Sequence, residues 1–338
     1  MKRVCGFCVV VLALAALPAF AQDTSVNVNS FTAPELPTVP EIDGVLEDSV
    51  WAAVPAIPMD KDGDSPAAEP GTGDLDITLK VAWDEETNCV FFGLHVIDES
   101  YINTSGHGSS VGDAGYNNER LEVVIDGSNS GLAESNTSSG WHHQYVFDMP
   151  NIVDPWDPDN AFYGMADTPV STEFIPVMVS EHIQAVLQPS ADTYPDGLNL
   201  ADDYIESAAQ LKCTNPDATE WMEQPVEFVW EVKLAIFEEL GPADGWYGYD
   251  LADPAMAATG FEEYLALPDH MRVDLAEDKV IGFTVQQNDG DVYNPDGQPT
   301  REHQTNTTGV AGNWNSSESL SGLILGPTLA GVDDWALR

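Results

Sequence analysis

The residues best suited to binding chemistry lie in one short stretch, residues 119–127, which reads Glu-Arg-Leu-Glu-Val-Val-Ile-Asp-Gly. Leu121, Val123 and Ile125 fall on one face of an extended segment, and Glu122 falls on the other face, as the two-residue period of a strand requires. The pattern predicts a central β-strand whose apolar side faces a core. A carboxylate on the opposite side makes charge-assisted hydrogen bonds and can accept two hydroxyl groups. Glu122 is therefore a candidate ligand contact, the alternative being a solvated strand face.

A second set of candidate residues is suited to a metal ion. Asp60, Asp62 and Asp64 alternate in the run Asp-Lys-Asp-Gly-Asp, and carboxylates at such spacing suit Ca²⁺. The run is not an EF-hand loop, because its glycine comes too early and no glutamate closes the loop. Asp289 and Asp291 form a comparable pair. Turns that use Asp for local hydrogen bonds are the alternative at both places, and calcium is the cofactor that the sequence predicts.

The cysteines allow one disulfide. Cys5 and Cys8 lie near the amino terminus in the expected leader, which leaves Cys89 and Cys213 in the rest of the chain. Two cysteines in an exported protein predict a bridge. Two buried thiols are the alternative.

The elements that position these residues are strands. Alternating or continuous apolar patterns predict strands at residues 75–83, 89–97, 119–127, 143–147, 174–179, 182–187, 226–236, 281–287 and 322–325. Helical patterns are short, such as the one after Asp43 in which Leu46, Val50 and Trp51 share a face. Strand follows strand without regular helices, so the predicted fold is all-β, an antiparallel β-sandwich with a few short helices and a long loop-rich insertion.

The chain divides into four predicted parts. Lys2 and Arg3 precede an apolar run that ends near Ala21, so residues 1–21 are predicted to be a signal peptide. A polar, proline-punctuated linker is expected over residues 22–40. The sandwich is expected over 41–326, with 128–225 largely an insertion and 188–225 irregular, and a tail follows over 327–338.

The charge of the chain excludes some partners. With 11 basic and 57 acidic residues the formal net charge is −46, and binding to nucleic acid or to an anionic membrane surface needs clustered Lys and Arg. After the leader, no apolar run approaches the ~20 residues that span a bilayer. The protein is expected to be secreted, either extracellular or periplasmic. The charge suits solubility in a salty medium, or a requirement for divalent cations.

Several landmarks, taken in order, resemble the family 9 carbohydrate-binding modules and the related extracellular sandwiches that include heme-binding cytochrome-like domains. The landmarks are Ile42-Asp43-Gly44 with Trp51, the strands at 75–83 and 91–98, the stretch 119–126, the strands at 226–236 and 281–289, and Trp314 before Gly322-Leu323-Ile324-Leu325. The resemblance implies that a sugar lies between two aromatic rings, that carboxylate and amide groups bind its hydroxyls, and that calcium supports the loops. By position it makes Tyr116 and Trp314 the two rings and Glu122 the acidic sugar contact.

The predicted function is a secreted, non-catalytic carbohydrate-binding protein that recognises a polysaccharide or its end by aromatic stacking. No nucleophile elbow, zinc-protease motif or phosphate loop is present, so no enzyme is expected. Two rival functions are a heme-binding electron-transfer domain, with His95 and Met149 or Met178 as nominal ligands, and a structural surface protein. His95 is more simply interpreted as a satisfied core histidine. Among the tryptophans, Trp83 and Trp230 are predicted to be core, and four lie in polar surroundings where they could line an extended groove: Trp141, Trp156, Trp221 and Trp246.

Overall fold

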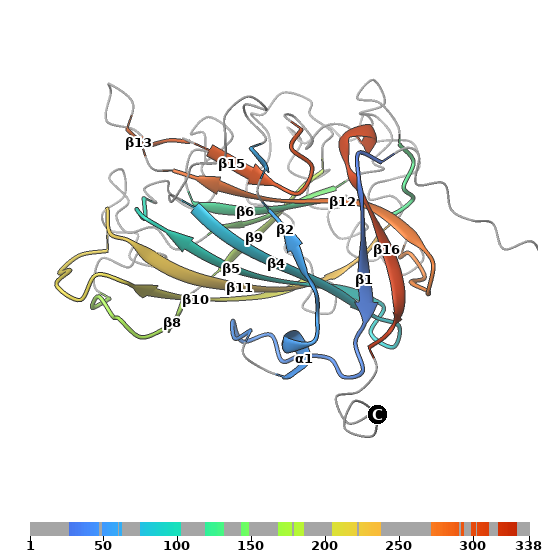
Figure 1. Cartoon of the computed structure of the whole chain (residues 1–338), viewed down its shortest axis with the longest axis horizontal. Helices are drawn as coiled ribbons and strands as arrows, with labels where there is room; N and C mark the ends of the chain where they lie inside the picture. Colours follow the sequence, from blue (N-terminus) through green and yellow to red (C-terminus); the bar gives the residue numbers. More distant parts are fainter. Residues whose placement is uncertain are drawn as a thin grey trace, which may run out of the picture.

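Two layers of strands, joined along one side by a strand near the amino terminus, form the fold of this computed structural model (Figure 1). The structure describes residues 27–46, 49–59, 61–62, 75–102, 119–131, 143–148, 168–177, 179–185, 205–221, 223–237, 272–290, 292–293, 299–301, 303–310 and 317–329. Among these residues the only α-helix is α1 (Ser49–Ala52), and no described helix has the length and apolar character needed to cross a membrane. The expected all-β fold is confirmed.

The first layer is built on the hairpin that the alternating pattern predicts. β4 (Leu75–Asp84) and β5 (Cys89–Asp98) pair antiparallel from Leu75↔Asp98 to Asp84↔Cys89. β11 (Val226–Ala235) pairs with the other edge of β5, followed by β10 (Ile205–Cys213) and β8 (Ile175–Val177). The short strand β2 (Ala56–Pro58) pairs with β4.

The second layer contains the stretch on which the sequence argument rests. β6 (Arg120–Asp126) lies between β12 (Val280–Asp289) and β7 (His143–Asp148), and β9 (Ser180–Ala185) pairs with the far side of β7. The free side of β12 is shared by β16 (Ser321–Thr328) along its first half and by β15 (His303–Asn306) along its second half. The strands β3 (Lys61–Asp62), β13 (Val292–Tyr293) and β14 (Pro299–Thr300) are two residues long, and a 3₁₀ turn spans Ser317–Ser319.

A strand also forms where a linker was expected. β1 (Ser30–Glu35) runs parallel to β16, and Glu35 pairs with Trp83 of β4, so β1 closes the seam between the layers. In Figure 1, β1 and β16 run steeply beside one another, across the ends of both layers. The linker prediction is therefore wrong for residues 30–35, because pairing partners far along the chain determine whether a proline-flanked segment is a strand.

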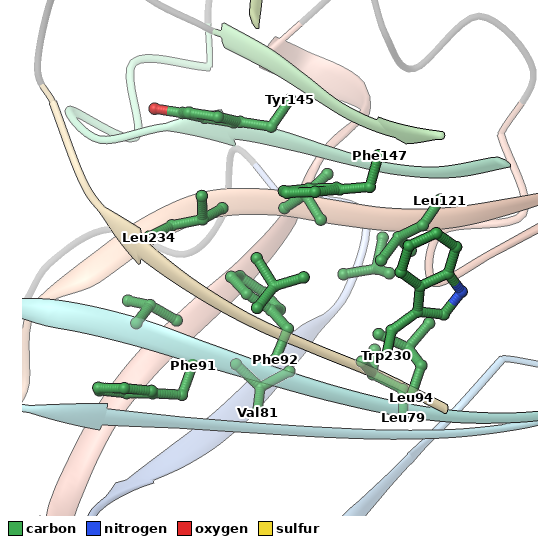
Figure 2. Close-up of a cluster of buried hydrophobic side chains, with 14 of the residues drawn as sticks. Leu79, Val81, Phe91, Phe92, Leu94, Leu121, Tyr145, Phe147, Trp230 and Leu234 are labelled. Atoms are coloured by element: carbon green, nitrogen blue, oxygen red, sulfur yellow. The ribbon is translucent and has the colours of Figure 1, made fainter. Parts of the chain in front are cut away.

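The core lies between the two layers. Figure 2 shows Leu79, Phe92 and Leu94 of the first layer facing Leu121 and Phe147 of the second, and all five side chains are buried. Burying one such side chain stabilises the fold by roughly 1.5–3 kcal/mol. The two-residue alternation of β6 and β12 turns the next residues outward, which is how the core positions the site described below.

Several other sequence predictions can now be compared with the structure. Trp51, Trp83 and Trp230 are buried as predicted, although α1 is shorter than the helix expected after Asp43. Residues 205–213 were expected to be irregular but form β10, in which the buried Ala209, Leu211 and Cys213 alternate with Gln210 and Lys212. Strands β7 to β10 extend both edges of the sheet, and whether 128–225 is an insertion stays a prediction.

Candidate functional site

The outward side of the second layer carries a row of polar side chains in place of ordinary surface residues. They lie on four neighbouring strands and are buried. We call this row the amide face, and it consists of Gln144 on β7, Glu122 on β6, Gln286 and Asn288 on β12, and Gln304 and Asn306 on β15.

Glu122 is the centre of the amide face. Its Oε2 accepts hydrogen bonds from Gln144 Nε2 at 2.7 Å and from Gln286 Nε2, and its Oε1 accepts one from Asn288 Nδ2 at 3.0 Å. Arg120 Nη1 lies 4.0 Å from Oε1. A buried carboxylate is tolerated when it is satisfied in this way. The prediction that Glu122 faces away from the core is right, but it is 3% exposed and is not on a solvated strand face.

The row continues from Asn288 toward β15. Asn288 Oδ1 accepts hydrogen bonds from Gln304 Nε2 at 2.9 Å and from Arg301 Nη1 at 3.4 Å. Amides both donate and accept, and a carboxylate accepts only, so the face as a whole can match groups that do both.

A second polar cluster lies at one end of the sandwich. Asp98 at the end of β5, Glu119 just before β6 and Asp289 at the end of β12 each bring one carboxylate oxygen within 4.8 Å of the others, and all three residues are buried. Glu119 Oε1 accepts a hydrogen bond from the Gly290 backbone N at 2.9 Å, and Glu119 Oε2 accepts one from Gln287 Nε2 at 3.3 Å. Three carboxylates this close repel one another unless a proton or a cation intervenes. Oxygen donors of this kind suit a hard cation such as Ca²⁺.

Part of the chain matches a known family in sequence. Residues 42–167 match the family model described as "Carbohydrate family 9 binding domain-like". This segment is similar to a carbohydrate family 9 binding domain. No curated protein sequence matches the chain.

Two solved structures are similar to the chain. One is a carbohydrate-binding module of family 9 from Caldicellulosiruptor kristjanssonii in complex with glucose, with 13% identity and a TM-score of 0.45 over 90% of this chain and 100% of that one. The other is a candidate carbohydrate-binding protein from Bacteroides uniformis, with 8% identity and a TM-score of 0.39 over 88% of this chain and 99% of that one.

Most of the site residues predicted from the sequence lie outside the described residues. Of the three predicted sugar contacts, the structure describes Glu122 alone, and Tyr116 and Trp314 stay predictions. The expected calcium ligands Asp60 and Asp64 also lie outside, as does the side chain of Asp62, whose backbone belongs to β3.

Two predictions about cysteine and tryptophan are corrected. Cys89 and Cys213 are free, buried thiols, and no disulfide joins them. They pair with Ala235 and Val226, at opposite ends of β11, so the strand separates them. Trp221 is buried, with its Nε1 donating to Thr168 O at 3.0 Å, and does not line a groove. Trp141, Trp156 and Trp246 lie outside the described residues.

His95 is satisfied as predicted, but it is not in the core. It is half-exposed, and its Nε2 lies 2.8 Å from Glu227 Oε1. Burial raises the pKa of Glu227, but hydrogen bonds from Lys212 and His95 outweigh burial and lower that pKa below its usual 4.5. His95 is therefore held by a carboxylate on the outer side of the first layer. Met149 and Met178 lie outside the described residues.

Two groups of functional candidates were missed from the sequence. The amides of β12 gave a partial signal, since Thr284 and Gln286 alternate with Phe283 and Val285 where a solvated strand would carry charges. The group of Asp98, Glu119 and Asp289 had only the signal that each residue adjoins a predicted strand. Asp289 was noted, but paired with Asp291, which lies outside the described residues.

Proposed function

We propose that this protein binds a polysaccharide or its end through the amide face, as a secreted, non-catalytic module. The observation that carries the proposal is Glu122, a buried carboxylate held by amide donors from β7 and β12 on the outward side of the sheet. The family 9-like match over residues 42–167 supports the same ligand class.

The chemistry of the amide face suits sugar hydroxyls. A hydroxyl donates one hydrogen bond and accepts others, so it needs acceptors such as Glu122 and donors such as the amide nitrogens of Gln144 and Gln304 close together. Hydrogen bonds to a carboxylate are shorter and stronger than bonds between neutral groups. A pre-formed row of this kind suits the recognition of a pattern of hydroxyl groups.

Aromatic stacking is the second part of the proposal. Tyr116 shortly precedes β6, and Trp314 lies between β15 and β16. Tyr116 and Trp314 are therefore close in sequence to strands that carry the amide face or adjoin it. This supports their expected role as rings that stack on the apolar faces of one sugar.

Calcium is the third part. Asp98, Glu119 and Asp289 are the residues that would hold the ion, since they offer buried oxygen ligands from strands of both layers. A bound divalent cation would neutralise the cluster and fasten the ends of β5, β6 and β12 near the amide face. Its role would be structural support for the face.

The first test is retention in affinity gels that contain single polysaccharides, such as neutral glucans, xylan, mannan and pectate. The wild type is expected to be retarded in at least one gel. Glu122→Gln is expected to lose about 10- to 100-fold in affinity, because hydrogen bonds to a charged group are worth roughly 1.5–3 kcal/mol. Trp314→Ala is expected to lose about tenfold or more, through the lost ring contact.

The matched control is Glu220→Gln, which removes the same charge from an exposed position. It is expected to bind like the wild type. Retention in none of the gels, or equal retention of Glu122→Gln and the wild type, would refute the proposed site. A Soret band in the purified protein would favour heme binding instead.

A further inference from the structure

The amino-terminal strand β1 is held by parts of the chain that are far away in sequence. It lies beside β16 along its length (Figure 1), where Gly322 N donates to Asn29 O at 2.8 Å and Leu329 N donates to Glu35 O at 2.9 Å. On its other edge, Glu35 pairs with Trp83 of β4. A β1 strand from a second copy of the chain would find the same partners in the same place.

β16 makes room for the side chains of the β1 segment by means of two glycines. A Cβ atom added to Gly322 would lie 2.7 Å from Asn27 Oδ1, and one added to Gly326 would lie 2.7 Å from Thr32 Cγ2. Both distances are too short for a side chain to replace either glycine without a shift. The place between β4 and β16 is therefore fitted to this strand in particular.

A short exposed segment joins β1 to the rest of the chain. Residues 37–39 are exposed, the chain bends at the first two of them, and Pro40 is buried. The next fixed point is the turn of residues 43–45, whose backbone N–H groups donate to Glu231 of β11. We call residues 37–39 the hinge. Pro37 restricts its conformations, and a short, stiff hinge favours the exchange of a terminal strand between copies.

Apolar side chains are exposed on both sides of β1. Within the described part of the chain three large apolar side chains are exposed, and two of them are Val28, at 46%, and Val39 in the hinge, at 36%. If two copies exchange β1 around a two-fold axis, their hinges run side by side across that axis. Each Val39 side chain then lies against the partner copy's hinge. A second copy thus covers apolar surface that the single chain leaves exposed.

The place of β1 is also expected to be filled late in folding. Glu35 and Thr328 contact one another although they are 293 positions apart. Segments this far apart lose loop-closure entropy before their contacts are gained, so such pairings form slowly. Until then the edges of β4 and β16 present unpaired backbone groups, which accept a matching strand from any chain. At high protein concentration, another copy supplies that strand.

We infer that β1 is an exchangeable strand, and that the place between β4 and β16 accepts the β1 strand of a second copy of this chain. Reciprocal exchange gives a two-fold dimer in which all the contacts of β1 are kept and new contacts form only at the hinges. A strand in its own chain has a high effective concentration, so the dimer is expected when folding takes place at high protein concentration. The inference does not depend on the proposed ligand.

The first test shortens the hinge. Deleting Thr38 and Val39 removes about 7 Å of reach, so β1 can no longer bend back onto its own copy but can extend into another. Light scattering after gel filtration is expected to give the folded variant twice the mass of one chain. The matched control is Thr38→Gly with Val39→Gly, which keeps the length of the hinge. It is expected to have the mass of one chain after folding in dilute solution.

The second test locates the strand in the full-length chain. Because the side chains of Glu35 and Thr328 touch across β1 and β16, Glu35→Cys and Thr328→Cys form a disulfide between chains only when β1 of one copy lies on β16 of the other. The two variants are unfolded, mixed, refolded at high concentration and treated with a mild oxidant, and a cross-linked pair is expected. Glu206→Cys mixed with Lys233→Cys, from a 3.1 Å pair across β10 and β11, is the control and is expected to give none.

Each outcome decides for or against the exchange. If the shortened chain folds and keeps the mass of one chain, β1 closes only its own copy and the inference is overturned. If it forms dimers but Glu35→Cys and Thr328→Cys cross-link no more than the control pair, the copies meet elsewhere and the inference is again overturned. If the shortened chain does not fold, the cross-linking of the full-length variants decides. Retention in polysaccharide gels tests the proposed function separately.

Discussion

At the scale of the single residue, the buried carboxylate of Glu231 binds the turn of residues 43–45 to the sheet through hydrogen bonds. Its Oε1 accepts from Trp51 Nε1 at 2.6 Å, and its Oε2 accepts from the backbone N of Asp43, Gly44 and Val45 at 2.9, 2.8 and 3.1 Å. Burial raises the pKa of Glu231 and these donors oppose the rise, with burial the larger effect. Glu231 thus stabilises the fold through the hydrogen bonds that its two oxygens accept, and not through its charge alone.

Glu231→Gln is expected to lower the free energy of unfolding by about 1–3 kcal/mol. The amide keeps one acceptor oxygen, so either Trp51 or the turn of residues 43–45 faces an N–H group and is left unsatisfied. Urea unfolding followed by tryptophan fluorescence measures the change. Glu206→Gln, which breaks an exposed pair with Lys233 at 3.1 Å, is the control and should cost under about 1 kcal/mol. Equal effects of the two variants would contradict this account.

At the scale of the element, β1 contributes to the fold as a strap between the layers. It pairs in parallel with β16, and Leu36 N donates to Trp83 O at 2.8 Å just beyond the strand. The Phe31 ring meets the Phe283 ring edge to face, with centroids 5.9 Å apart. The other strand neighbours of β4 and β16 lie within their own layers, so β1 is the strand that pairs with both along this side. Trp83 Nε1 of β4 also donates directly to Gly326 O of β16 at 2.9 Å.

Removing the chain through Leu36 is therefore expected to destabilise the protein strongly. Loss of the buried Leu36 side chain alone is worth roughly 1.5–3 kcal/mol, and the edges of β4 and β16 become unpaired. The measurement is the melting temperature, compared with a chain that starts at Asn27. If the two chains have the same melting temperature, β1 does not hold the layers together, and contacts between their side chains are sufficient.

At the scale of the whole molecule, the dominant property is a net charge of −46. Three of the acidic residues, Asp98, Glu119 and Asp289, lie close together in one buried cluster. Self-repulsion of this size destabilises the compact state and is screened by salt. A cation bound at the cluster would add a specific stabilisation that ionic strength alone does not supply.

Calcium chloride is therefore expected to raise the melting temperature more than sodium chloride at equal ionic strength. At a hundredfold excess over the dissociation constant, a single site adds about 2.7 kcal/mol. Asp289→Asn should abolish the difference between the two salts, while the exposed Asp274→Asn should keep it. If both salts raise the melting temperature of the wild type equally, the cluster binds no calcium and the effect is screening.

The sequence by itself determined which faces of the main strands are buried. In β4, β6, β11 and β12 the apolar residues recur at every second position, and this period follows from backbone geometry within each strand. The all-β class and the outward direction of Glu122 could therefore be predicted. Strands such as β1 and β10 were not predicted. β1 is short and lies among prolines, and the alternation of β10 includes small and polar residues, so pairing with their neighbours decides their structure.

Only the tertiary structure decided which polar residues meet. Glu122, Gln286 and Asn306 lie at opposed positions because β6, β12 and β15 are neighbours in a fixed register. Asp98 lies close to Glu119 and Asp289 because their strands, from both layers, end at the same place. Strand order and register depend on contacts between segments up to hundreds of residues apart, which local periodicity does not encode. For the same reason the predicted Cys89–Cys213 bridge fails, since β11 holds the two sulfur atoms at its opposite ends.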